Sequence, residues 1–99
     1  MSKPILDKAE VAIDFPDKFY HGTFSHSSRY EVNLDEDGVH ISLDRQGDET
    51  RHVSFHIHHQ LFAGILNSIA DQIDRKHKLP DHERERLREV TEKLFRKLK

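Results

Sequence analysis

The feature that most constrains this chain is a change of apolar period at residues 58 and 59. Before it, apolar and polar side chains alternate, as they do in a strand with one buried face. After it, apolar side chains recur every three to four residues, as they do along one side of a helix. The alternating apolar residues are Val53, Phe55 and Ile57, and the helical ones are Leu61, Phe62, Ile65, Leu66, Ile69 and Ile73. The chain is therefore expected to pass directly from a strand into a helix.

Short alternating segments precede this joint and predict an antiparallel sheet. Two of them span residues 11–15 and 18–24, while residues 1–8 have no period and are expected to be flexible. The clearest hairpin spans residues 29–44. The sequence is compatible with two registers for this hairpin, because both of them keep the apolar side chains on one face.

A two-residue turn at residues 37–38 pairs Leu34 with Ile41 in this hairpin. A four-residue loop pairs Leu34 with Val39 instead. The acidic turn at residues 35–37 lacks the twelve-residue ligand spacing of a calcium loop and is expected only to be solvated.

A first helix is expected to end near Arg75, and Leu79-Pro80-Asp81 signals the start of a second one. The second helix carries a narrow apolar stripe with charged flanks, which suits packing on the first helix or on a second copy. We predict a single α+β domain over residues 1–99. Residues 10–58 form an antiparallel β-meander of four to five strands, and residues 59–99 form a helical hairpin packed on one sheet face.

Composition limits the size of the core and the kinds of chemistry. The chain has 99 residues, 34% hydrophobic and 34% charged, and therefore one small core under a heavily charged surface. Its free energy of unfolding is expected near the low end of ~5–15 kcal/mol unless a partner covers more area. The absence of cysteine excludes disulfides, thiolate nucleophiles and cysteine-ligated metals. No long apolar segment is present, so we expect a cytoplasmic location and no membrane partner.

Charge is unevenly distributed along the chain. Residues 1–75 carry 7 basic and 13 acidic side chains, a net charge of −6, whereas residues 76–99 carry 9 and 5, a net charge of +4. Together with the thin core, the basic helix predicts a homodimer or a small protein partner. The expected contact residues are Leu87, Val90, Leu94 and Leu98, with Arg84, Arg88 and Arg96 at the rim. The function expected first is therefore a non-enzymatic binding or regulatory module that self-associates through its helical hairpin.

Nine histidines give an alternative function. His52, His56 and His58 share the outward face of one predicted strand, and His40 lies on the outward face of its neighbour. Side chains that face each other across neighbouring strands are ~5 Å apart, and zinc, nickel and copper accept imidazole ligands. These four histidines therefore predict a metal-binding or phosphate-handling site. No cofactor is expected for the function named first. A divalent transition metal belongs to this alternative, and no carboxylate is placed beside the histidines by spacing.

The run from His56 to Phe62, HIHHQLF, resembles the active-site strand of the histidine-triad superfamily, where histidine alternates with apolar residues. The nucleotidylyltransferase branch of that superfamily has glutamine at the third position, here Gln60. The resemblance implies that His58 attacks a phosphate. It covers seven of 99 residues, has His59 where an apolar residue is usual, and lacks a glycine-rich or basic phosphate-binding segment.

Single-stranded nucleic acid is a further alternative partner. Proteins that bind it combine a basic groove with exposed aromatic side chains on a sheet. The predicted sheet is net acidic, and Arg29 and Arg51 do not make a groove by themselves. Nucleic acid is therefore not expected to be the partner.

Overall fold

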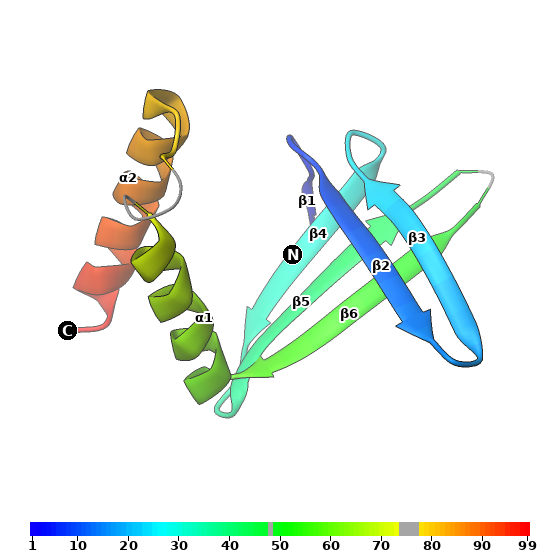
Figure 1. Cartoon of the computed structure of the whole chain (residues 1–99), viewed down its shortest axis with the longest axis horizontal. Helices are drawn as coiled ribbons and strands as arrows, with labels where there is room; N and C mark the ends of the chain where they lie inside the picture. The colour runs from blue at the N-terminus through cyan, green and yellow to red at the C-terminus, as the bar shows by residue number, and fades with distance from the viewer. Residues whose placement is uncertain (48, 74–77) are drawn as a thin grey trace. The chain divides into compact units, whose positions relative to one another are not determined.

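The computed structural model describes residues 1–47, 49–73 and 78–99 (Figure 1). Its elements are β1 (Lys3–Pro4), β2 (Ala9–Phe15), β3 (Lys18–Phe24), β4 (Ser28–Leu34), β5 (Gly38–Arg45), β6 (Arg51–His58), α1 (His59–Gln72) and α2 (Asp81–Lys97). The chain divides into two compact units, a sheet unit of residues 1–62 and a helical unit of residues 63–99.

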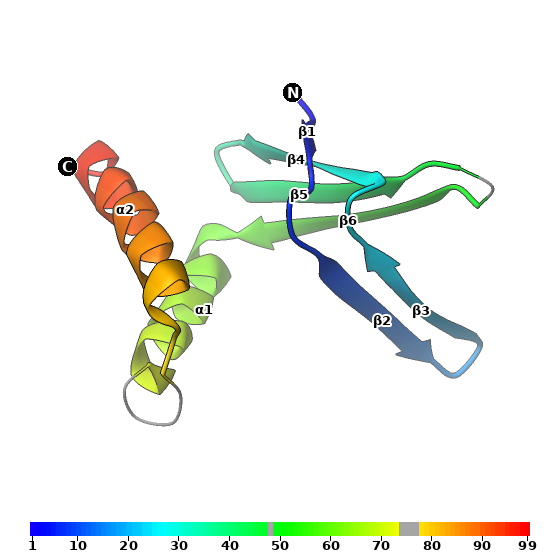
Figure 2. The ribbon, with the colours of Figure 1, turned by 90° about the horizontal axis from the view of Figure 1, so that it is seen from above.

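The predicted α+β class, with an antiparallel sheet followed by two helices, is confirmed. The strands divide between two ladders, a four-stranded sheet in the order β1-β4-β5-β6 and a separate hairpin of β2 and β3. Figure 2 shows the β2–β3 hairpin turning away from the four-stranded sheet. The edge of β4 is taken by β1, whose two residues pair with Tyr30 and Arg29. The packing of the helices on a sheet face stays a prediction.

The hairpin of β4 and β5 adopts the register with the four-residue loop. Leu34 pairs with Val39, and Arg29 pairs with Asp44. At the mouth of the loop, the backbone N–H of Asp35 donates to the carbonyl of Gly38 at 2.9 Å. The two-residue turn at residues 37–38 is therefore not formed.

Gly38 has a steric role in this register. It pairs with His58 of β6, and a Cβ atom at position 38 would collide with the backbone carbonyl of Ile57. A residue with a side chain would have to push the two strands apart. The close approach of the β5 and β6 backbones at this position therefore favours glycine over any residue with a side chain.

The core of the sheet unit is small. Among the described residues, the buried apolar side chains are Ile5, Phe24 and Val39, and Phe24 is 0% exposed. The guanidinium of Arg45 lies 5.9 Å from the centre of the Phe24 ring and donates to the carbonyl of Thr23 at 3.3 Å. These contacts join the end of β3 to the end of β5. The backbone N–H of Ile5, in the segment expected to be flexible, donates to Ser28 at 3.1 Å.

The helical unit buries no residue of either helix. Helix α1 begins at His59, directly after β6, as the change of period predicts. Its expected end near Arg75 lies outside the described residues. Helix α2 begins at Asp81, within the segment that signals a helix start, with Pro80 as the N-cap residue, and the N–H of Arg84 donates to the carbonyl of Pro80 at 2.9 Å. The apolar side chains of both helices are half-exposed, so the described part of this unit, residues 63–73 and 78–99, has no closed core.

Candidate functional site

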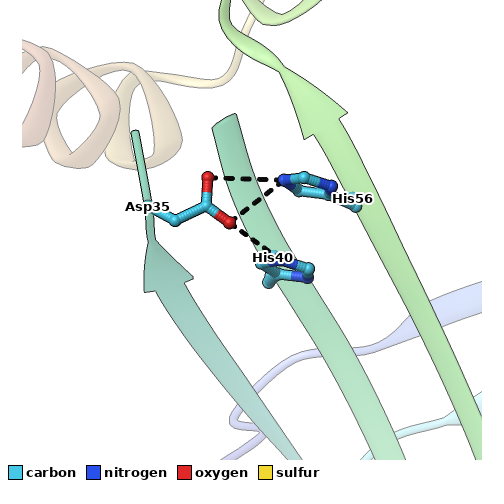
Figure 3. A group of neighbouring side chains, drawn as sticks. All are labelled: Asp35, His40 and His56. Atoms are coloured by element: carbon cyan, nitrogen blue, oxygen red, sulfur yellow. Dashed lines mark hydrogen bonds and ion pairs between the residues drawn. The ribbon is translucent and has the colours of Figure 1, made fainter. Parts of the chain in front are cut away.

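The register of the sheet brings two of the four predicted histidine ligands together. His40 of β5 pairs directly with His56 of β6, and their side chains lie on the same face because both strands alternate from that pair. The two imidazole rings stack with centroids 3.8 Å apart and planes inclined by 1°. This contact forms the centre of the candidate site (Figure 3).

A carboxylate that the sequence analysis did not place there completes the cluster. In Figure 3 the side chain of Asp35, from the end of β4, reaches across β5 toward both rings. Its Oδ2 atom lies 3.0 Å from Nε2 of His40 and 3.2 Å from Nε2 of His56. One potential ligand atom from each residue lies within 4.8 Å of the other two. We call Asp35, His40 and His56 the Asp–His–His cluster.

The turn holds the Asp35 carboxylate in this orientation. Its Oδ1 atom accepts hydrogen bonds from the backbone N–H groups of Gly38 at 2.8 Å and Asp37 at 2.9 Å. The Gly38 bond contributes most to lowering the pKa of Asp35 to about 2. The Asp37 bond and His56 add to this effect, and partial desolvation opposes it. The carboxylate is therefore ionised near neutral pH, with Oδ2 left to face the histidines.

The other two predicted ligands lie outside this cluster. His52 pairs with Asp44, and its Nδ1 atom is within hydrogen-bonding distance of the Asp44 carboxylate. It stands four residues from His56 along β6, about 13 Å at the usual rise of a strand. The ring of His58 is closer, with its centroid 4.9 Å from that of His56 and a tilt of 53°. His58 is thus the neighbour of the cluster, and His52 is part of a separate pair.

A sequence signal for Asp35 does exist. In the register with the two-residue turn, Asp35 lies directly opposite His40. In the register with the four-residue loop, Asp35 lies on the same face as His40, two residues from Asn33, the residue that pairs with His40. An aspartate that opens a turn also commonly accepts hydrogen bonds from the N–H groups two and three residues later. These two signals together would have placed a carboxylate beside the histidines.

The helical unit holds a second candidate site, a groove of about 600 Å³ between its two helices. We call it the helical groove. Leu66, Ile69 and Ala70 of α1 line one wall. The predicted interface residues that line it are Leu87, Leu94, Leu98, Arg84 and Arg88. Val90 and Arg96 are absent from its lining.

Neither α1 nor α2, as far as each is described, is both long enough and apolar enough to cross a bilayer. No protein-family model, curated protein or solved structure matches the chain. The resemblance to the histidine-triad superfamily therefore remains local. It is also interrupted in the structure, because His59 and Gln60 belong to α1 and do not continue the strand of His56 and His58.

Proposed function

We propose that this chain is a small, non-enzymatic binding module of the cytoplasm that associates with a second copy of itself through the helical groove. The observation that carries the proposal is the exposure of the apolar stripe. No residue of α1 or α2 is buried, and the apolar side chains facing the groove are open to solvent.

The stability of short amphipathic helices supports a partner that covers the apolar faces of α1 and α2. Isolated helices shorter than about 12–15 residues are marginal in water, and in proteins an amphipathic helix gains most of its stability by packing its apolar face. Helix α1, with 14 residues, lies within this marginal range, and α2, with 17, is only slightly longer. Their stability therefore depends on what fills the groove, since so little of their own surface is buried.

The charges of α2 suit a second copy in antiparallel orientation. Asp81 and Glu83 lie in its first turn, and Arg96 and Lys97 lie in its last turn. A two-fold axis that crosses α2 would bring the acidic end of one helix to the basic end of the other. The same arrangement aligns the helix dipoles favourably.

Sedimentation velocity at tens of micromolar tests the proposal, and we expect a dimer. Leu94→Glu places a charge in the helical groove and should give a monomer, since leucine and glutamate both favour helices. Val90→Glu separates the groove from the rest of the predicted apolar stripe, because Val90 was an expected contact residue and is 45% exposed against 41% for Leu94 but does not line the groove. A monomeric wild-type chain, or a dimer unaffected by Leu94→Glu, would refute self-association through this surface.

A further inference from the structure

We propose that Asp35, His40 and His56 bind one divalent transition-metal ion of the zinc class. The inference is independent of the proposed self-association, because all three residues belong to the sheet unit. It rests on the donor set, on the spacing of the donor atoms, and on the way in which the turn orients the carboxylate.

The donor atoms are already spaced for a common ion. Zinc binds imidazole nitrogen and carboxylate oxygen at about 2.0–2.2 Å, so two donors on a tetrahedral ion lie roughly 3.4 Å apart. Oδ2 of Asp35 lies 3.0 Å from Nε2 of His40 and 3.2 Å from Nε2 of His56. An ion can therefore replace the present hydrogen bonds with a shift of only a few tenths of an ångström at the carboxylate.

The stacked rings have to tilt apart for the ion to bind. The lone pair of each Nε2 lies in its ring plane, and the two planes are inclined by only 1°, so the lone pairs do not yet converge on one point. The side chains of His40 and His56 are 51% and 32% exposed. Little packing opposes a rotation of either side chain, and opening of the stack is thus a structural signature of metal binding.

The carboxylate needs no comparable rearrangement. Two backbone N–H groups of the turn hold Oδ1, and Oδ2 points toward the histidines. Hydrogen bonds of this kind orient metal-binding side chains and strengthen binding, because the ligand does not have to be ordered when the ion arrives. The backbone of the turn thus orients the Asp35 ligand from within the same hairpin.

Two imidazoles and one carboxylate leave at least one coordination position open. Zinc sites with three protein ligands take a water molecule or a small ligand in the fourth position. The cluster is on the exposed face of the sheet, so that position opens to solvent. The site is therefore suited to an ion with an exchangeable ligand and differs from a closed structural centre.

Calorimetric titration of the full chain with zinc tests the site, with cobalt absorption as a second readout of tetrahedral coordination. His40→Ala, His56→Ala and Asp35→Asn should each weaken zinc binding about tenfold or more. Asparagine keeps the hydrogen-bond acceptors of the turn while removing the charge, so Asp35→Asn preserves the loop. Amide NMR spectra of each variant verify that the sheet is folded.

His52→Ala is the matched control, because His52 lies on the same face and strand and is paired with a carboxylate of its own. It should leave zinc affinity within about twofold, well below the loss expected for a ligand. No zinc binding by the wild-type chain would overturn the proposal. An equal loss in His52→Ala and His56→Ala would also overturn it, since zinc would then be bound by the histidine-rich face as a whole.

Discussion

The candidate sites of the two units differ in chemistry, although both units expose apolar side chains, such as Leu34 in the sheet unit and Leu87 in the helical unit. The sheet unit displays polar groups in a defined geometry, where the Asp35 carboxylate meets two stacked imidazoles. The helical unit displays apolar area, and its ion pairs are exposed contacts between neighbouring turns, such as Arg88 with Glu85 at 3.4 Å. Directed donors suit a small ion, whereas apolar area suits another protein surface.

The units also differ in what stabilises them. The sheet unit has complete antiparallel ladders and a fully buried Phe24. The helical unit has no buried residue in either helix. The two units therefore differ in the apolar area that each buries within itself, since the sheet unit encloses Phe24 while the apolar side chains of the helices stay exposed.

Substitution of Phe24 should have the largest effect and act on the sheet unit first. Phe24→Ala removes the largest fully buried side chain, and we expect it to lower the free energy of unfolding by about 3–5 kcal/mol. Both tyrosines, Tyr20 and Tyr30, belong to the sheet unit, so tyrosine fluorescence during urea unfolding follows this unit alone.

Phe19→Ala is the control, since Phe19 is 76% exposed and its loss should change stability by less than about 0.5 kcal/mol. Circular dichroism at 222 nm reports mainly on the helices in the same samples. Similar losses for the two variants would show that Phe24 does not anchor the sheet unit.

A pair of glycine substitutions should have intermediate effects of opposite sign in the two units. Gly38→Ala meets the backbone of Ile57, and we expect a loss of about 1–3 kcal/mol. Gly64→Ala lies in α1 with nothing within 4 Å of the added Cβ, and should stabilise the helix by about 0.5–1 kcal/mol.

Thermal unfolding of both variants measures this contrast. A gain of stability in both variants would contradict the close approach of Gly38 to the backbone of Ile57. A Gly64→Ala variant that lost stability and dimerisation together would place Gly64 inside the contact with the second copy.

The smallest expected effect is a pH dependence from Asp35. Its folded pKa is lowered to about 2 from an ordinary value of 3.8, so the folded state binds its proton less readily than the unfolded state does. The stability that this carboxylate contributes is present above about pH 4 and is lost as the pH falls toward 2.

Comparison with Asp35→Asn isolates this contribution from the other carboxylates. The difference in unfolding free energy between wild type and variant should shrink as the pH falls through that window. A difference that stayed constant from pH 5 to 2 would mean that the turn does not hold the Asp35 carboxylate in solution.

Much of the fold was predictable, because the local period of apolar residues indicates where each strand or helix lies. The strand that bears His56 ends where the apolar period changes, and α1 begins at the next residue. The same alternation predicted that His40 and His56 lie on one face. The absence of His52 from the cluster follows from its distance along the strand.

The Asp–His–His cluster itself was not predicted, because the acidic turn was considered only as a calcium loop and the orientation of the Asp35 carboxylate depends on N–H groups of that turn. Asp35 belongs to a turn whose sequence is compatible with two registers, and the apolar faces match in both. Both registers leave Asp35 on the face of His40, so the face was predictable, whereas the residue opposite Asp35 was not.

By itself, the sequence determined the order and type of the elements, since these follow from hydrophobic period and turn residues over short distances. Only the tertiary structure decided where Asp35 lies. The close approach of Gly38 to Ile57 and the N–H groups of the turn accompany one register, and in that register the turn orients the carboxylate toward the two histidines. Contacts between strands distant in sequence decide such a detail, because local pattern is equally satisfied by either pairing.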